Sequence, residues 1–207
     1  MNQFLLIAAA HFLATLSPGQ DFLLLVRTSL RQGRRAGLIC ASGIAAANAV
    51  WIAAILAGLE GVRDIDPLMT ALRWLGGLFL IWLGWRFVRS QPARPEDAAS
   101  PAQAADTLPG TTGKALWVGL LSGLSNPKNG LFYASLFSFG MSTQTPLVIR
   151  SLYGAWMVGV VLVWDALVAL SLGHPKAQAL LQRWRHRIDQ GAGAVLLAMG
   201  VAVMLRG

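Results

Sequence analysis

The 207-residue chain has little cysteine and little charge. Cys40 is its one cysteine, so no disulfide can form within the chain, and we expect a small packing residue there. Charged residues make up 13% of the sequence, whereas hydrophobic residues make up 55%. An average soluble domain has about 25% charged residues, so this balance excludes that class and predicts a membrane protein.

The sequence also lacks the residue sets of the common enzyme classes. It has no serine, histidine and acid in the context of a hydrolase triad, no histidine and cysteine cluster for a metal, and no Walker-type loop for ATP. We therefore expect a protein that is not an enzyme and needs no cofactor. Transport driven by ATP would need another subunit, and a membrane-embedded enzyme would need a nucleophile or metal set.

Six long apolar stretches account for most of the chain. A helix needs about 20 apolar residues to cross a bilayer, and each stretch is close to that length or exceeds it. The N-terminal stretch is as long as a signal peptide, but it begins without lysine or arginine and no A-x-A site follows, which favours a retained span. The six expected transmembrane helices cover residues 4–26, 37–59, 68–88, 115–139, 147–173 and 188–205.

Basic residues gather in alternate loops between these stretches. The second loop is acidic and the fourth is nearly uncharged up to Arg150. Cytoplasmic loops of membrane proteins carry an excess of lysine and arginine, so the pattern predicts that both termini lie outside the cytoplasm. The net charge of +8 is therefore interpreted as a topology signal, and no nucleic-acid partner is expected. The first, third and fifth loops hold Arg27, Arg31, Arg34, Arg35, Arg86, Arg89, Arg94, Lys114, Lys176, Arg183, Arg185 and Arg187.

The segment 90–113 is polar and rich in proline and alanine, which predicts a flexible cytoplasmic linker. It separates two regions, 1–89 and 114–207, that each hold three of the six stretches. Because three is an odd number, two similar halves would have opposite orientations in the membrane. The sequence thus predicts an all-α membrane protein built as two inverted three-helix repeats.

Glycines support this repeat weakly. The sequences "RWLGGLFLIWLG" and "DQGAGAVLLAMG" align Gly77 with Gly193 and Gly84 with Gly200. Small residues let membrane helices approach closely, so a packing role is expected for these glycines irrespective of any repeat. The expected packing positions are Gly76, Gly77, Gly84, Gly191, Gly193 and Gly200.

The first and fourth stretches are each interrupted near the middle, by "LSPGQ" and "LSNPKNG". Proline is favoured at the first position of a helix, directly after a capping residue. Ser17 and Asn126 are therefore predicted to cap new helices that begin at Pro18 and Pro127, and Gln20 would complete a capping box with Ser17. The alternative is a pair of simple proline kinks.

Two helices that begin inside the membrane offer a site for an anion. The N-terminus of a helix carries about half a positive charge, and Lys128 adds a full charge at the second break. In inverted halves the two positive ends would meet near the midplane, where Ser17–Gly19 and Asn126–Lys128 would hold a small carboxylate. Paired interruptions of this kind are typical of the binding site of a secondary transporter.

Four other polar residues inside the apolar stretches bear on function. Asp165 lies in "VVLVWDALVAL", where a charged residue is costly and therefore indicates a function. Either Asp165 or Asp21, in the first turn of the restarted helix, would bind an ammonium group or a coupling proton. Asn48 fits interhelical hydrogen bonding or ligand contact equally, and His11 is interpreted as a satisfied interior polar group.

At these motifs the chain resembles a known family. The segments "HFLATLSPGQDF", "RTSLRQGRRAG", "GLLSGLSNPKNGLFYASLF" and "RWLGGLFLIWLGWRFVR", with the final "RHRIDQGAGAVLLAMG", are similar to the lysine exporter (LysE/RhtB type) superfamily, and most similar to its threonine and homoserine efflux branch. The resemblance implies export of small amino acids across the bacterial inner membrane, driven by proton exchange.

The chain departs from the usual family pattern in three places. It has Gln20 where the family often has proline in "SPGPD", Asn48 where an acid is frequent, and "LFSFG" instead of "LFPQF" after the second break. The resemblance therefore predicts the class of protein, an amino-acid exporter, but it does not predict the substrate or the coupling stoichiometry.

The combined prediction is an exporter of threonine or homoserine, by proton antiport. One alternative is export of lysine, arginine or a cysteine-pathway metabolite. Another is a channel or a membrane scaffold that transports nothing. A homodimer is left open. The expected partners are the amino acid, the lipid bilayer and the proton. The expected substrate-binding residues are Ser17, Pro18, Gly19, Asp21, Asn48, Asn126, Pro127, Lys128 and Asp165.

Overall fold

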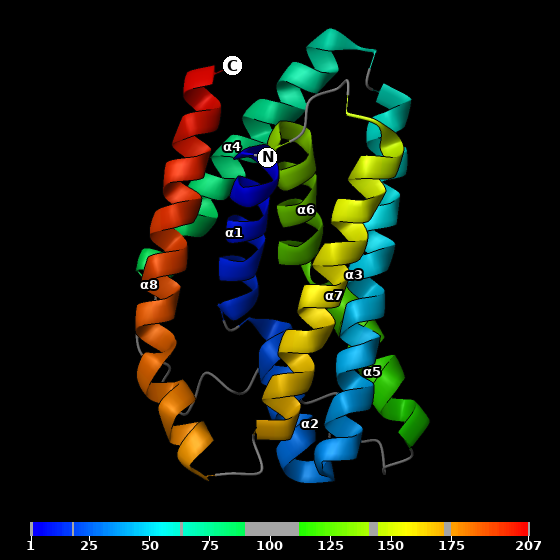
Figure 1. Cartoon of the computed structure of the whole chain (residues 1–207), viewed down its shortest axis with the longest axis vertical. Helices are drawn as coiled ribbons and strands as arrows, with labels where there is room; N and C mark the ends of the chain where they lie inside the picture. Colours follow the sequence, from blue (N-terminus) through cyan, green and yellow to red (C-terminus); the bar gives the residue numbers. More distant parts are fainter. Residues whose placement is uncertain are drawn as a thin grey trace.

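The computed structural model describes residues 2–17, 19–62, 64–89, 112–140, 145–171 and 175–206. Within these residues the chain forms eight helices and no strand, as expected for an all-α protein (Figure 1). Most of the predicted linker, residues 90–111, lies outside the described residues, and α5 already begins at Thr112. The helices are α1 (Asn2–Leu16), α2 (Gln20–Gln32), α3 (Arg34–Val62), α4 (Asp66–Val88), α5 (Thr112–Ser125), α6 (Pro127–Gly140), α7 (Leu147–Ser171) and α8 (Pro175–Arg206).

The first and fourth apolar stretches are each divided into two helices, α1 with α2 and α5 with α6. In Figure 1, α1 and α2 follow one another toward the lower end, whereas α5 and α6 follow one another toward the upper end. Both breaks therefore lie near mid-height, with α2 and α6 starting there in opposite directions. The other four stretches form α3, α4, α7 and the segment His186–Leu205 of α8, all long and apolar enough to cross a membrane.

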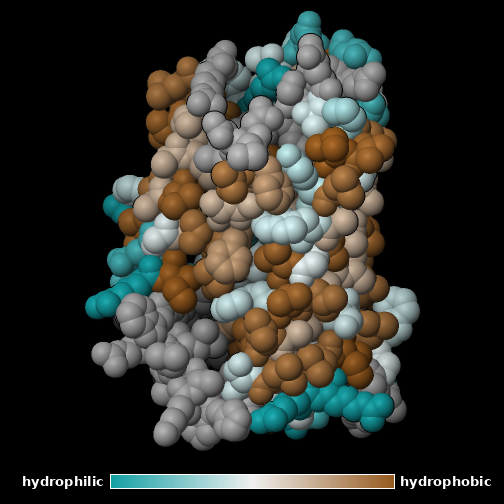
Figure 2. Space-filling model, viewed as in Figure 1, coloured by the Kyte–Doolittle hydropathy of each residue, from teal (hydrophilic) through white to brown (hydrophobic). Residues whose placement is uncertain are grey.

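Large apolar side chains cover the outside of this bundle, while polar ones are buried within it. Leu75 is 63% exposed and Leu205 is 82% exposed, whereas Asp165 is 7% exposed and Asp189 is 6% exposed. Figure 2 shows apolar residues over the middle of the molecule and most of the hydrophilic residues toward its ends. This distribution suits a protein whose sides contact lipid and whose interior holds a polar site.

Glycine contacts join α4 and α8 along their length. A Cβ atom added at Gly84 would lie 2.7 Å from the carbonyl oxygen of Gly193, and one added at Gly200 would lie 2.8 Å from that of Gly77. The predicted packing role is confirmed for these four residues and for Gly76, which packs against Ser135 of α6. It is wrong for Gly191, where a Cβ would meet nothing within 4 Å.

These contacts predict unequal effects of two substitutions on α8. A methyl group at Gly193 would lie 2.6 Å from the Gly84 carbonyl oxygen, which is backbone and cannot yield without moving α4. We expect Gly193→Ala to lower the free energy of unfolding by about 1–3 kcal/mol, the usual cost of overpacking. Thermal unfolding in detergent measures this, with Gly191→Ala as the control. Equal midpoints for the two variants would contradict the packing account.

Candidate functional site

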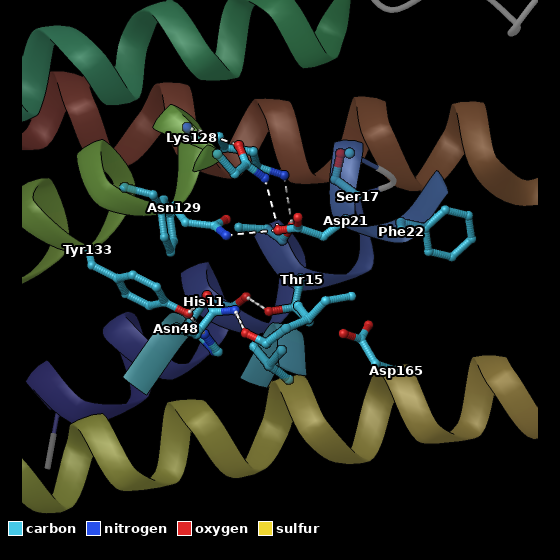
Figure 3. Close-up of a pocket in the computed structure, with 16 residues that line it drawn as sticks. His11, Thr15, Ser17, Asp21, Phe22, Asn48, Lys128, Asn129, Tyr133 and Asp165 are labelled. Carbon is cyan, nitrogen blue, oxygen red and sulfur yellow. Dashed lines mark hydrogen bonds between the residues drawn. The ribbon is translucent and has the colours of Figure 1, made fainter. Parts of the chain in front are cut away.

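A cavity of about 70 Å³ lies where the two helix breaks meet (Figure 3). A buried water needs about 10–15 Å³, so this volume holds several waters or part of a small solute. The walls come from five helices, α1, α2, α3, α6 and α7, and from the breaks themselves. The lining residues are His11, Ala14, Thr15, Ser17, Gly19, Asp21, Phe22, Ile44, Asn48, Asn126, Lys128, Asn129, Phe132, Tyr133, Val161 and Asp165.

Most of the residues predicted for substrate binding meet in this cavity. Pro18 lies outside the described residues, and Pro127 is exposed at the start of α6 and does not line the cavity. Pro127 is the first residue of α6, and the residue that follows it, Lys128, lines the cavity. The predicted residues that do line it are Ser17, Gly19, Asp21, Asn48, Asn126, Lys128 and Asp165.

The predicted start of α6 is confirmed. The helix begins at Pro127, and the backbone N–H of Lys128 donates a hydrogen bond to Asn126 Oδ1 at 3.1 Å. Asn126 is thus a helix cap of the usual kind, satisfying a backbone donor that has no partner within the helix. The break in the fourth stretch is a second helix start rather than a kink.

The predicted cap of α2 is wrong. This helix begins at Gln20, its N-cap is Gly19, and no side chain caps it. The Ser17 hydroxyl instead donates a 2.6 Å hydrogen bond to Asp189 Oδ1 on α8. A hydrogen bond to a carboxylate is stronger than one to a neutral group, which explains why the hydroxyl is directed away from α2. Gln20 is the first helical residue, so the predicted capping box does not form.

Asp21 accepts hydrogen bonds from three side chains of the second half of the chain. Ser122 Oγ donates to Oδ1 at 2.7 Å, while Asn126 Nδ2 and Asn129 Nδ2 donate to Oδ2 at 2.9 and 2.8 Å. Figure 3 shows the bond from Asn129 to the Asp21 carboxylate. One side chain on α2 therefore ties together the end of α5 and the start of α6.

Among the described residues that line the cavity, Lys128 is the one lysine or arginine. Its ammonium group donates to the carbonyl oxygen of Ala14 at 3.4 Å and lies 4.8 Å from the centre of the Phe87 ring. A Cβ atom added at Gly19 would lie 3.6 Å from the same nitrogen. The ammonium therefore stands beside the uncapped start of α2, where two sources of positive charge meet.

Asp165 differs from Asp21 in the bonds of its carboxylate. It is 7% exposed and lines the cavity from α7, with its carboxylate turned into the cavity in Figure 3. Within the part of the chain that the structure describes, it makes no hydrogen bond and no ion pair. The cavity thus has a lysine at one wall and a carboxylate without a partner at another.

A chain of hydrogen bonds lines the remaining wall. Tyr133 Oη donates to Asn48 Oδ1 at 2.8 Å, and Asn48 Nδ2 donates to the carbonyl oxygen of Ile44 at 2.8 Å. Because the Tyr133 proton is engaged there, His11 Nε2 is the donor in its 3.4 Å contact with Tyr133 Oη. Among the described residues no group bonds to the buried His11 Nδ1, so the interpretation of His11 as a satisfied interior polar group is wrong at this atom.

Sequence reasoning missed several members of this site. Asn129 and Tyr133 are four residues apart on α6, and His11 and Thr15 are four residues apart on α1. Residues four apart share a helix face, so this spacing was an available signal. Asp189 offered none, because it stands at the edge of the last apolar stretch, where a charge is ordinary.

A family model described as LysE type translocator matches residues 12–207. The chain belongs to the LysE type translocator family. The predicted family is confirmed, and the apolar helices and buried polar cavity belong to a membrane translocator. This LysE type translocator has no match among solved structures.

Two curated relatives cover nearly the whole chain of this LysE type translocator, and a third covers about two thirds of it. The threonine efflux protein of Salmonella typhimurium is 29% identical over 206 residues, which are 99% of this chain and 98% of the relative. The threonine efflux protein of Escherichia coli (strain K12) is 28% identical over 98% of this chain and 97% of the relative. The leucine efflux protein of Enterobacter sp. (strain 638) is 31% identical over 66% of this chain and 62% of the relative.

Proposed function

We propose that the protein is a secondary active exporter of small neutral amino acids, with threonine and homoserine as the first candidates. The observation that carries the proposal is a cavity between two helix breaks that holds a lysine and a carboxylate, Asp165, with no hydrogen bond or ion pair to any described residue. An amino acid has one carboxylate and one ammonium group, which match these two charges. The names of the full-length relatives, threonine efflux proteins, favour the same substrate.

In this proposal the substrate carboxylate binds at the start of α2. The helix has no side-chain cap, so the N–H groups of its first turn are available to an anion. Lys128 lies beside Gly19 and supplies a full positive charge at the same place. Asn126 keeps the first turn of α6 capped, which directs the anion to α2 and Lys128 rather than to both helix ends equally.

The proposed topology is six spans in two inverted repeats, residues 1–89 and 114–207, with both termini on the outer side of the bacterial inner membrane. Two observations support it. The broken helices of the two halves run in opposite directions, and α1 begins at the same end of the molecule at which α8 ends (Figure 1). Gly77 and Gly84 align in sequence with Gly193 and Gly200, yet Gly77 contacts Gly200 and Gly84 contacts Gly193, as a two-fold axis between the halves requires.

Export can be tested in cells that take up a threonine dipeptide and hydrolyse it. We expect cells that produce the protein to hold less threonine inside and to tolerate more dipeptide than cells that produce the Lys128→Met variant at the same level. Unchanged intracellular threonine would count against threonine as substrate. A counterflow screen in liposomes across the amino acids, with leucine, lysine, arginine and cysteine included, would then rank the alternatives.

A channel or scaffold is the competing class. Neither requires a capped second helix start or an unpartnered buried carboxylate inside the membrane. Absence of saturable amino-acid flux in liposomes that contain the purified protein would favour it.

A further inference from the structure

Three acidic residues lie in or beside the cavity, and the structure divides their roles. We infer that Asp165 alone binds the substrate ammonium and the coupling proton in turn, while Asp21 and Asp189 hold the two helix breaks in place. This inference rests on the proposed export function. It selects one acid where the sequence left Asp21 and Asp165 as equal candidates.

Asp21 is unsuited to binding a substrate because its carboxylate is already occupied. Three neutral donors, from Ser122, Asn126 and Asn129, hold its two oxygens at 2.7–2.9 Å. A substrate ammonium that bound Asp21 would have to displace bonds that connect α2 to α5 and α6. Such a carboxylate fixes the geometry of the breaks without a substrate.

The Asp189 carboxylate is also engaged in a hydrogen bond. Its Oδ1 accepts the 2.6 Å hydrogen bond from Ser17, which anchors the end of α1 to α8. It does not line the cavity, so a substrate there does not reach it. Asp21 and Asp189 are also the two acids whose negative charges act on Lys128. Asp189 therefore holds the first break against α8, while Lys128 remains the group proposed for the substrate carboxylate.

The Asp165 carboxylate, unlike those of Asp21 and Asp189, is not held by a hydrogen bond from another described residue. It is 7% exposed, it lines the cavity, and it makes no hydrogen bond or ion pair among the residues that the structure describes. An unpaired charge in the membrane interior is costly, so this carboxylate needs a cation to neutralise it. A proton and a substrate ammonium are the two cations that fit, and one carboxylate is neutralised by one of them at a time.

Among the described residues, the titratable groups around Asp165 do not supply that cation. Those electrostatically coupled to it are Asp21 on α2, Cys40 on α3 and Tyr133 on α6, none of which is cationic. His11 on α1 lines the same cavity, and its Nε2 faces Tyr133. Lys128 contacts Ala14 and stands beside Gly19, at the break.

This arrangement gives a simple exchange. With the proton on Asp165, the carboxyl group is neutral and has no charge to offer an ammonium group. When the proton leaves to one side of the membrane, the carboxylate can bind the ammonium of a substrate whose carboxylate lies at Lys128. One proton is released for each amino acid bound, so the two move in opposite directions. The substrate class is a zwitterion with an unblocked α-ammonium group.

The first test measures transport by the full chain in liposomes with an acidic lumen. We expect labelled threonine to accumulate as protons leave. Asp165→Asn should reduce accumulation to the level without a gradient and raise the half-saturating threonine concentration about 10- to 100-fold, the range expected for losing a hydrogen bond to a charged group. Asp165→Glu should restore gradient-driven accumulation. Wild-type accumulation and affinity in Asp165→Asn would overturn the inference.

The second test needs no substrate and separates the inference from the proposed function. In detergent at neutral pH, Asp165→Asn should raise the midpoint of thermal unfolding, because asparagine has no carboxyl group that must either stay charged without a partner or take up a proton when the protein folds. Asp21→Asn and Asp189→Asn should lower it because each disturbs bonds that join helices. A lower midpoint in Asp165→Asn would show that Asp165 has a structural partner and overturn the inference. Failure of the wild-type protein to move threonine, with the expected midpoints, would overturn threonine export alone.

Discussion

Replacing Lys128 by methionine is expected to reduce export about 10- to 100-fold, since a hydrogen bond to a charged group contributes about 1.5–3 kcal/mol. Methionine keeps an unbranched side chain, one atom shorter than that of lysine, but it removes the ammonium group that stands near the Phe87 ring and beside Gly19. The substrate carboxylate would then have only the first turn of α2 to bind. Initial rates of labelled threonine counterflow in liposomes measure the effect.

Two further variants show whether this loss belongs to the site. Lys114→Met removes a lysine near the start of α5, outside the cavity lining, and should leave the rates near wild type. Lys128→Arg keeps the charge but adds bulk where the ammonium already contacts Ala14 and Phe87, so an intermediate rate is expected. Equal rates for Lys128→Met and the wild-type protein would remove Lys128 from the binding site.

The second large effect is expected on stability, from Asp21→Ala. This substitution leaves the Ser122 hydroxyl and the side-chain amides of Asn126 and Asn129 without their shared acceptor. We expect the free energy of unfolding to fall by about 3 kcal/mol, within the range for hydrogen bonds to a charged group that leave donors unsatisfied. Thermal or denaturant unfolding of the purified protein measures it.

A double-mutant cycle with Ser122→Ala isolates one of these bonds. Ser122→Ala alone should cost about 1 kcal/mol, and it should cost nearly nothing when Asp21 is already alanine. Additive effects of the two substitutions would mean that the 2.7 Å contact between the two residues contributes no coupling.

Local signals in the sequence predicted the helix breaks, and long-range contacts decided how each break is held. Asn126, Pro127 and Lys128 are adjacent, so the start of α6 and its cap could be inferred from three residues. Ser17 directly precedes Pro18 and is an equally typical helix cap by its local sequence. Its hydrogen-bond partner is nevertheless Asp189, 172 residues away in the chain. No local pattern reports which of two acceptors a serine selects when one of them is a distant carboxylate.

The same limit applies to the acids and the glycines. Asp21 and Asp165 are both acids in apolar stretches, and only the donors from Ser122, Asn126 and Asn129 distinguish an occupied carboxylate from an unoccupied one. Gly191 and Gly193 are two residues apart on α8, where the first faces open space and the second faces Gly84. In a membrane helix the lipid-facing and protein-facing sides are both apolar, so hydrophobicity alone does not separate them.

The central claim is that the cavity binds both charged groups of an amino acid, and competition in counterflow tests it most directly. Liposomes that contain the wild-type protein would exchange labelled threonine in the presence of excess threonine amide, which lacks the carboxylate, or N-acetylthreonine, which lacks the ammonium. We expect that unlabelled threonine competes and that neither analogue does. Competition by threonine amide as strong as that by threonine would contradict the binding of the substrate carboxylate at Lys128.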